Sequence, residues 1–195
     1  MSENSLNKSK LKTQQITTVG ILFAVTIVLG STGLGFIPIP PINTTIMHIP
    51  VIIGSLIAGP VVGGLTGLLF GIFSMFRAMN LPSPVSFLFM NPIIALIPRI
   101  LIGVTPYLIY KFVKTKSNIF NLSLACAIGS FTNTIGVMGL IYILYIDKFA
   151  NALHISLNAA KTTILAYMLN GFVSASVAIV ISVPVVMAVK KTFIR

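Results

Sequence analysis

The stretch TTIMHIPVIIGSLIAGPVVGGLTGLLFGIFSM, residues 44–75, contains two apolar segments separated by the helix-breaking sequence AGPVVGG. The first segment, 47–58, is too short to cross a hydrocarbon layer about 30 Å thick, because a crossing takes about 20 helical residues. The second, 61–77, approaches that length and has Pro60 near its first turn, where a missing N–H costs nothing. We therefore expect a short helix that begins inside the protein and is followed by a spanning helix.

The rest of the chain is equally apolar. Hydrophobic residues make up 56% of the 195 residues and charged residues only 8%, so polar side chains cannot cover a globular surface. Breaks at Pro, Gly and Lys clusters predict helices at roughly 16–34, 47–58, 61–77, 86–111, 119–145 and 159–189. The predicted fold is an all-α integral membrane protein, a six-transmembrane-helix bundle.

No polar linker is long enough to separate two domains, so we expect one membrane domain, 16–195, after a cytosolic segment, 1–15. That segment lacks the pattern of a cleavable signal peptide, and the first helix should be retained. Between the first two helices, the loop GLGFIPIPPINTTIM, residues 33–47, contains three prolines that forbid a regular helix. We expect this loop to be extended and to form a hairpin or lid on the outer side.

The positive charge is arranged as in a membrane protein. The formal net charge is +11, with Glu3 and Asp147 as the acidic residues, but no basic surface with interleaved aromatics indicates nucleic-acid binding. With six spans, one side of the membrane receives Lys8, Lys10, Lys12, Lys111, Lys114, Lys116, Lys190, Lys191 and Arg195. The positive-inside rule predicts a multi-pass protein of the cell membrane with both termini in the cytoplasm.

Arg99 interrupts the apolar sequence NPIIALIPRILIGVTPYLIYKFVK, residues 91–114. It lies twelve residues before Lys111, or about 18 Å along a helix, which places it near the middle of the membrane. A guanidinium there is costly unless it faces a cavity, an anion or carbonyl groups. Because neither carboxylate of the chain lies in a helix core, we expect an anionic ligand to be its partner.

Polar residues on other helices can form a site with Arg99. Asn133 and Asn170 lie at comparable depth, Asn91 lies higher on the helix of Arg99, and their amides suit a ligand with hydroxyl and amide groups. The alternative is hydrogen bonding between helices. His48 begins the short helix, where a ligand contact and a capping or interfacial role are equally compatible with the sequence. Arg77 is predicted at the outer end of its helix, where it contacts the ligand or extends to water.

Small residues recur every four positions in two predicted helices. Gly63, Gly67 and Gly71 form such a series, which we expect to pack against the helix 47–58. Gly20 and Ala24 form a second small-residue series, in the first helix. Packing within the chain and contact with a second protein are both compatible with this series.

Several function classes are excluded by what the sequence lacks. It has no phosphate-binding GxxxxGK[ST], no HExxH, no paired carboxylates and no favourable Ser/His/Asp set, so we expect no enzyme activity. The lone Cys126 argues against a cysteine-based metal site, and we expect no metal or other cofactor. Intramembrane Asp or Glu for proton or sodium coupling is also missing. A binding protein of this kind needs a partner that supplies energy.

With these features, the sequence resembles the substrate-binding S components of energy-coupling factor (ECF) vitamin transporters along nearly its whole length. The resemblance is carried by the basic N-terminus, the small-residue pattern of the first helix, the loop 33–47 and above all residues 44–75. It is greater to S components for pantothenate than to those for thiamine, riboflavin or biotin.

The resemblance implies a six-helix bundle that captures a vitamin outside and docks on a membrane T subunit with two cytosolic ATPases. The family's Ala-xxx-Ala docking motif falls on Gly20 and Ala24, with glycine in place of the first alanine. Family ligands bind under the first loop, which adds Asn43 to the expected site of His48, Arg77, Asn91, Arg99, Asn133 and Asn170. The alternatives are an S component for folate, cobalamin, a pyridoxine-type compound or a precursor, and a stand-alone small permease.

Overall fold

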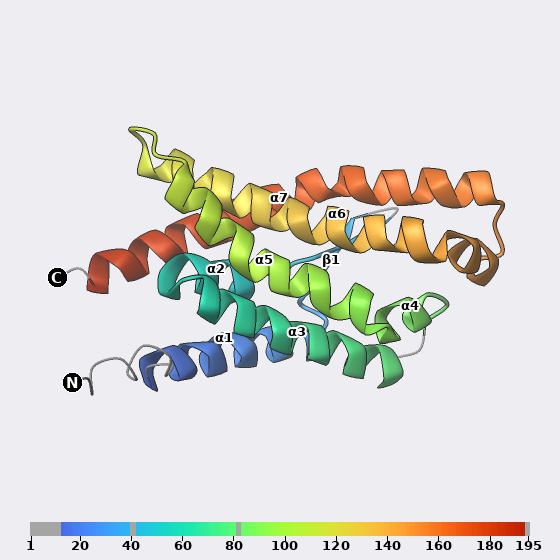
Figure 1. The fold of residues 1–195 in the computed structure, drawn as a ribbon, viewed down its shortest axis with the longest axis horizontal. Coiled ribbons are helices and arrows are strands. Elements are labelled where there is room, and N and C mark those ends of the chain that lie inside the picture. The colour runs from blue at the N-terminus through green and yellow to red at the C-terminus, as the bar shows by residue number, and fades with distance from the viewer. Residues whose placement is uncertain (1–12, 40–41, 81–82, 194–195) are drawn as a thin grey trace, which may run out of the picture.

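The computed structural model describes residues 13–39, 42–80 and 83–193, and within this part the chain forms a bundle of helices with one small β-hairpin (Figure 1). The helices are α1 (Thr13–Ser31), α2 (Ile49–Ala58), α3 (Pro60–Asn80), α4 (Ser86–Met90), α5 (Pro92–Phe112), α6 (Asn118–Ala152) and α7 (Leu157–Phe193), and the strands are β1 (Phe36–Ile39) and β2 (Ile42–Thr45). Five helices of the described part are long and apolar enough to cross a membrane: α1, α3, α5, α6 and α7. The chain is therefore a membrane helical bundle.

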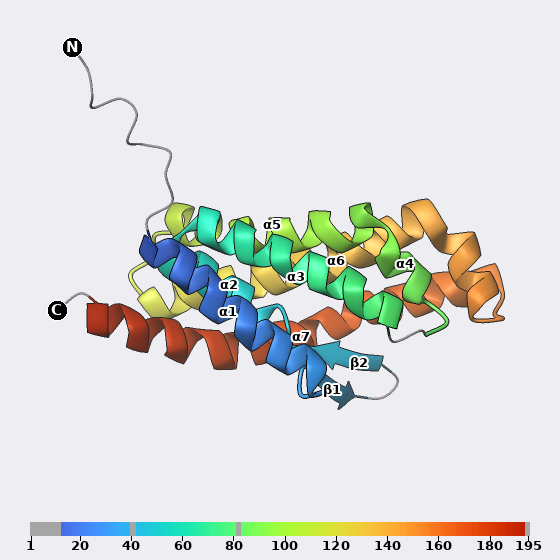
Figure 2. The ribbon, with the colours of Figure 1, turned by 90° about the horizontal axis from the view of Figure 1, so that it is seen from below.

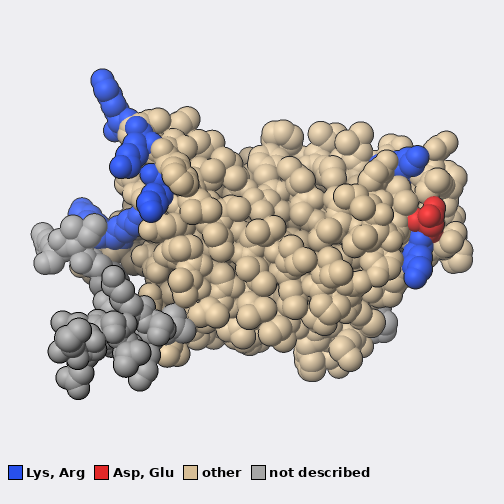
Figure 3. Space-filling view, viewed as in Figure 1, with Lys and Arg blue, Asp and Glu red and all other residues tan. Residues whose placement is uncertain are grey.

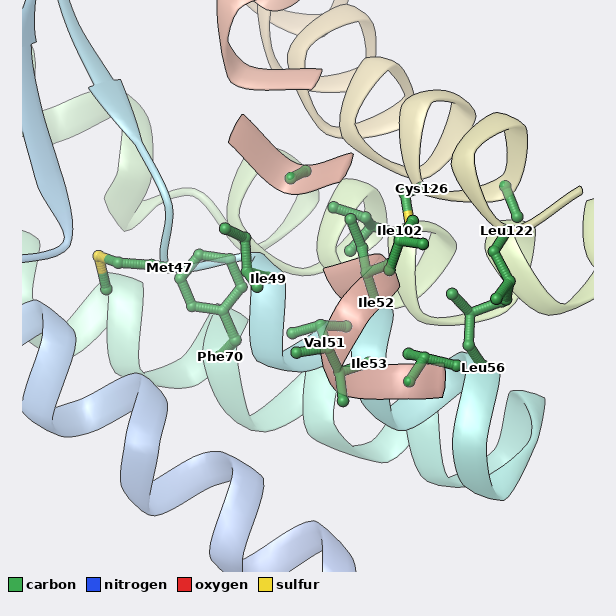
Figure 4. Packing of buried hydrophobic residues seen from close by; sticks show 14 residues of the cluster. Met47, Ile49, Val51, Ile52, Ile53, Leu56, Phe70, Ile102, Leu122 and Cys126 are labelled. Atoms are coloured by element: carbon green, nitrogen blue, oxygen red, sulfur yellow. The ribbon is translucent and has the colours of Figure 1, made fainter. Parts of the chain in front are cut away.

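The short helix α2 forms the centre of one of the two hydrophobic clusters in the described part of the chain. It has 10 residues and ends at Ala58 as predicted, although it begins two residues later than the predicted 47–58, and eight of its residues, Ile49 to Leu56, are buried. Its aliphatic side chains pack against Phe70 of α3, Ile102 of α5, and Leu122 and Cys126 of α6 (Figure 4). Apart from Ser55 the helix is apolar on every face, because it has neighbours on all sides rather than one buried face.

The glycines of α3 pack mainly against α5, so the prediction that they pack against α2 is wrong for most of the series. A Cβ at Gly67 would overlap the carbonyl oxygen of Arg99, and one at Gly71 would lie 2.6 Å from the carbonyl oxygen of Ala95. Gly63 is the exception, because it meets both Gly103 of α5 and Ser55 of α2. These close backbone contacts fix the position of α5, which carries Arg99.

The predicted helix 86–111 is also wrong as a single helix, because it divides into α4 and α5 at Asn91. Asn91 is extended (φ −76°, ψ 121°) and its Oδ1 accepts a hydrogen bond of 2.9 Å from the N–H of Ile93. Pro92 explains the break, since proline disfavours helical backbone in the residue before it and suits the first position of a new helix. The break turns α4 across the end of the bundle.

The loop between α1 and α2 forms the expected hairpin. Strands β1 and β2 pair antiparallel, with Phe36 opposite Thr45 and Ile39 opposite Ile42. Figure 2 shows the hairpin beside the end of α1, and β2 also contacts α7. The hairpin follows α1 in the chain and also packs against α7, the last helix.

Charged residues gather at the two ends of the bundle and leave its girth uncharged on the face shown in Figure 3. The end of the bundle where α1 begins and α7 ends in Figure 1 carries Lys111, Lys114, Lys116, Lys190 and Lys191. The N-terminal lysines and Arg195, which also entered the predicted orientation, lie outside the described residues.

Candidate substrate-binding site

A cavity of about 220 Å³ lies between the hairpin, α4, α5, α6 and α7. Its polar lining consists of Thr45, Arg99, Asn133, Thr134, Asn170 and Ser174, and its remaining lining of Phe89, Val137, Met138, Tyr167 and Gly171. Three of the predicted site residues, from three different helices, therefore meet at one cavity: Arg99, Asn133 and Asn170.

Arg99 is held in place by its own helix and by two aromatic rings. Pro98 has no N–H to donate to the carbonyl of Ile94, four residues earlier, and Nη1 of Arg99 donates to that carbonyl instead. The guanidinium carbon lies 5.7 Å from the ring centroid of Phe70 and 5.4 Å from that of Phe89. Both distances are within the range of cation–π attraction. The rest of the molecule thus fixes this cation before any ligand arrives.

These contacts leave part of the guanidinium unsatisfied. Arg99 is only 6% exposed, and its Nε–H has no hydrogen-bond partner among the described residues. Asp147, the acidic residue in the described part of the chain, is exposed near the end of α6. A buried cation without a carboxylate favours an anion from outside the chain.

The wall opposite α5 is formed by α6 and α7. Asn133 lines the cavity, and its Oδ1 is buried without a hydrogen-bond partner in the described structure. Tyr167 and Ser174 line the cavity together with Asn170. Sequence reasoning missed both, although they lie three residues before and four after Asn170 and so share its helical face.

His48 lies behind the cavity rather than on its surface. It is completely buried, it makes no side-chain cap to α2, and its Nε2 lies 3.2 Å from Oγ of Ser130. Of the roles left open by the sequence, capping is wrong. Oγ of Ser130 is in turn 3.2 Å from that of Ser174, so His48 reaches the cavity through two serines.

Arg77 and Asn91, also predicted for the site, do not line the cavity. Arg77 lies in the last turn of α3, and its Nη1 is 3.8 Å from the sulfur of Met47. Nδ2 of Asn91 donates a hydrogen bond of 2.6 Å to the hydroxyl of Tyr145, where α6 is kinked. The side chain of Asn43 lies outside the described residues.

The small-residue pair of α1 lies on the outside of the bundle. Gly20 and Ala24 are exposed, and no atom lies within 4 Å of a Cβ built at Gly20. Their large neighbours are exposed as well: Ile21 by 61%, Val25 by 44% and Val28 by 56%. In a membrane this face contacts lipid or another protein.

Comparison with known proteins agrees with this architecture. The family model described as ECF transporter, substrate-specific component, matches residues 14–189. The chain belongs to this family.

This S component is also 32% identical, over 165 aligned residues, to the pantothenic acid transporter PanT of Lactococcus lactis subsp. cremoris (strain MG1363). The match covers 77% of the chain and 80% of the relative. Membership in the family makes the protein a membrane transport component and not an enzyme.

Proposed function

We propose that this chain is the pantothenate-binding S component of an ECF importer and that the cavity around Arg99 is its binding site. The observation that carries the proposal is the buried guanidinium of Arg99, which faces a cavity without a carboxylate among the described residues. Pantothenate has one carboxylate, two hydroxyls and an amide. Arg99 binds the carboxylate, and the amides of Asn133 and Asn170 bind the other polar groups.

The size of the cavity supports a compact ligand. Its volume of about 220 Å³ is below the range of roughly 300–1,000 Å³ typical of sites for drug-sized molecules. Pantothenate is much smaller than folate or cobalamin, and both of these would require a large expansion of the site. Relatedness to a pantothenic acid transporter favours the same cargo.

Delivery of the vitamin requires partners. The exposed face of α1 around Gly20 and Ala24 docks on the T subunit, which is driven by two cytosolic ATPases. The lysine-rich end of the bundle faces the cytoplasm, in keeping with the positive-inside rule, so both termini are cytoplasmic. The cavity and the hairpin then open toward the outside.

Calorimetric titration of the detergent-purified chain tests the proposed cargo. The panel contains pantothenate, folate, biotin, riboflavin, thiamine and cobalamin. We expect one tight ligand, pantothenate, at a stoichiometry of one. Tight binding of another vitamin would overturn the pantothenate assignment, and binding of none would overturn the whole assignment to these six vitamins.

Transport is tested separately in proteoliposomes. Uptake of pantothenate should require co-reconstitution with the T subunit and both ATPases, together with ATP. Uptake by the chain alone would overturn the dependence on partners and would indicate a stand-alone permease.

A further inference from the structure

A chain of hydrogen bonds connects buried His48 to the cavity. Nε2 of His48 lies 3.2 Å from Oγ of Ser130, and Oγ of Ser130 lies 3.2 Å from Oγ of Ser174. Ser174 then donates to the carbonyl oxygen of Thr45 at 3.5 Å. The four residues come from the start of α2, from α6, from α7 and from β2, and Ser174 and Thr45 also line the cavity.

The direction of this chain follows from the number of hydrogens available. A carbonyl oxygen can only accept, so the single hydroxyl hydrogen of Ser174 is used for Thr45. Ser130 must therefore be the donor toward Ser174, which uses its own hydrogen. With Ser130 oriented in this way, His48 donates through Nε2–H, which is the tautomer that this chain of hydrogen bonds requires. As a result, Ser174 has no hydrogen left for a ligand, but one lone pair remains.

Of the two neighbouring residues 133 and 134 on α6, Thr134 has the same polarity as Ser174. The hydroxyl hydrogen of Thr134 is used for the carbonyl oxygen of Ser130, at 3.3 Å, which leaves its oxygen as an acceptor. Asn133 is different, because its amide can donate through Nδ2 as well as accept through Oδ1, which has no hydrogen-bond partner among the described residues. Both residues line the cavity. Tyr167 and Asn170 can donate as well as accept, so they do not determine the polarity of this wall.

The opposite side has the reverse character, because the guanidinium of Arg99 has donors and no acceptor. We infer that Thr134 and Ser174 form an acceptor wall that selects acids with hydroxyl or amide N–H donors away from the carboxylate. This inference rests on the proposed function. The role of His48 and Ser130 is to hold Ser174 in the accepting state.

The acceptor wall is proposed to determine which ligands bind. This role differs from a purely structural one in its effect on the ratio of the affinities for two ligands. If the serines and Thr134 only connect helices, their loss weakens the binding of every ligand equally. If they accept from the ligand, their loss weakens only ligands that carry the matching donor. The discrimination between two ligands, not the affinity for one, separates the two roles.

The experiment uses the full chain with Thr134→Val or Ser174→Ala and measures Kd by calorimetry. The ligands are pantothenate and three analogues: two in which one hydroxyl is replaced by hydrogen, and one with a methylated amide nitrogen. Thr134→Val keeps the shape of the side chain. Ser176→Ala is the matched control, because Ser176 is exposed on α7 and bonds to the carbonyl of Phe172.

We expect at least one analogue to bind the natural protein about tenfold more weakly than pantothenate, as for the loss of one buried hydrogen bond. In the matching variant pantothenate should weaken by about the same factor, and the discrimination should fall to about one. Ser176→Ala should keep the discrimination.

Unchanged discrimination for all three analogues in both variants would overturn the acceptor wall while leaving the proposed cargo intact. Failure of the natural protein to bind pantothenate is the separate result that overturns the proposed function. Two variants on different helices keep the test decisive if one of them does not fold.

Discussion

Replacement of Arg99 by glutamine removes the charge that we assign to carboxylate recognition. Glutamine keeps an amide donor near the carbonyl of Ile94, so the bundle should still fold. Because Arg99 is 6% exposed, its pairing with a carboxylate is a buried one. Breaking such a pair costs about 2–5 kcal/mol, and each 1.4 kcal/mol is a factor of ten, so Kd for pantothenate should rise by roughly 30-fold to several thousand-fold.

The assay compares two ligands to isolate the charge. Pantothenol has a primary alcohol where pantothenate has its carboxylate, and Arg99→Gln should raise its Kd by no more than about tenfold, since one hydrogen bond and no ion pair is lost. Arg77→Gln is the control, because Arg77 does not line the cavity. Equal weakening of both ligands, or pantothenate binding within about threefold of the natural protein, would refute the assignment of the carboxylate to Arg99.

Three further variants test the packing, the docking face and the end of the bundle. Gly67→Val should destabilise the protein by about 1–3 kcal/mol or more, because a Cβ at this position meets the backbone of α5. Gly139→Ala should leave the stability nearly unchanged, because a Cβ there enters open space. Thermal unfolding in detergent measures both effects. Gly20→Leu should leave pantothenate binding unchanged but prevent copurification with the T subunit, and an intact complex would rule out this docking face. Asn91→Ala should lower stability by about 1–2 kcal/mol through loss of a helix cap and of the bond to Tyr145, with Tyr145→Phe losing less.

Much of the fold was predictable because its signals are local. The end of α2 followed from the break at Gly59 and Pro60, and the hairpin followed from the prolines of its loop. The division of α4 from α5 was missed although Asn91–Pro92 is also a local signal. The partner of the α3 glycines was missed for a different reason, since a small-residue stripe permits close approach but does not say which helix approaches.

Three residues that line the candidate cavity were predictable from their positions along their helices. Arg99, Asn133 and Asn170 lie at similar depths on three helices, and the structure brings them to one cavity. The contact between Arg99 and the carbonyl freed by Pro98 was readable in principle from the Pro-Arg pair. The connection from His48 to Ser174 was not, because it depends on the relative rotation of α6 and α7, which no single helix determines.

An experimental structure of the chain with bound pantothenate tests the central claim most directly. The account predicts the vitamin inside the cavity, with its carboxylate within about 3 Å of the guanidinium of Arg99 and its hydroxyls or amide toward α6 and α7. A carboxylate bound to Arg77, or a vitamin bound outside this cavity, would contradict it.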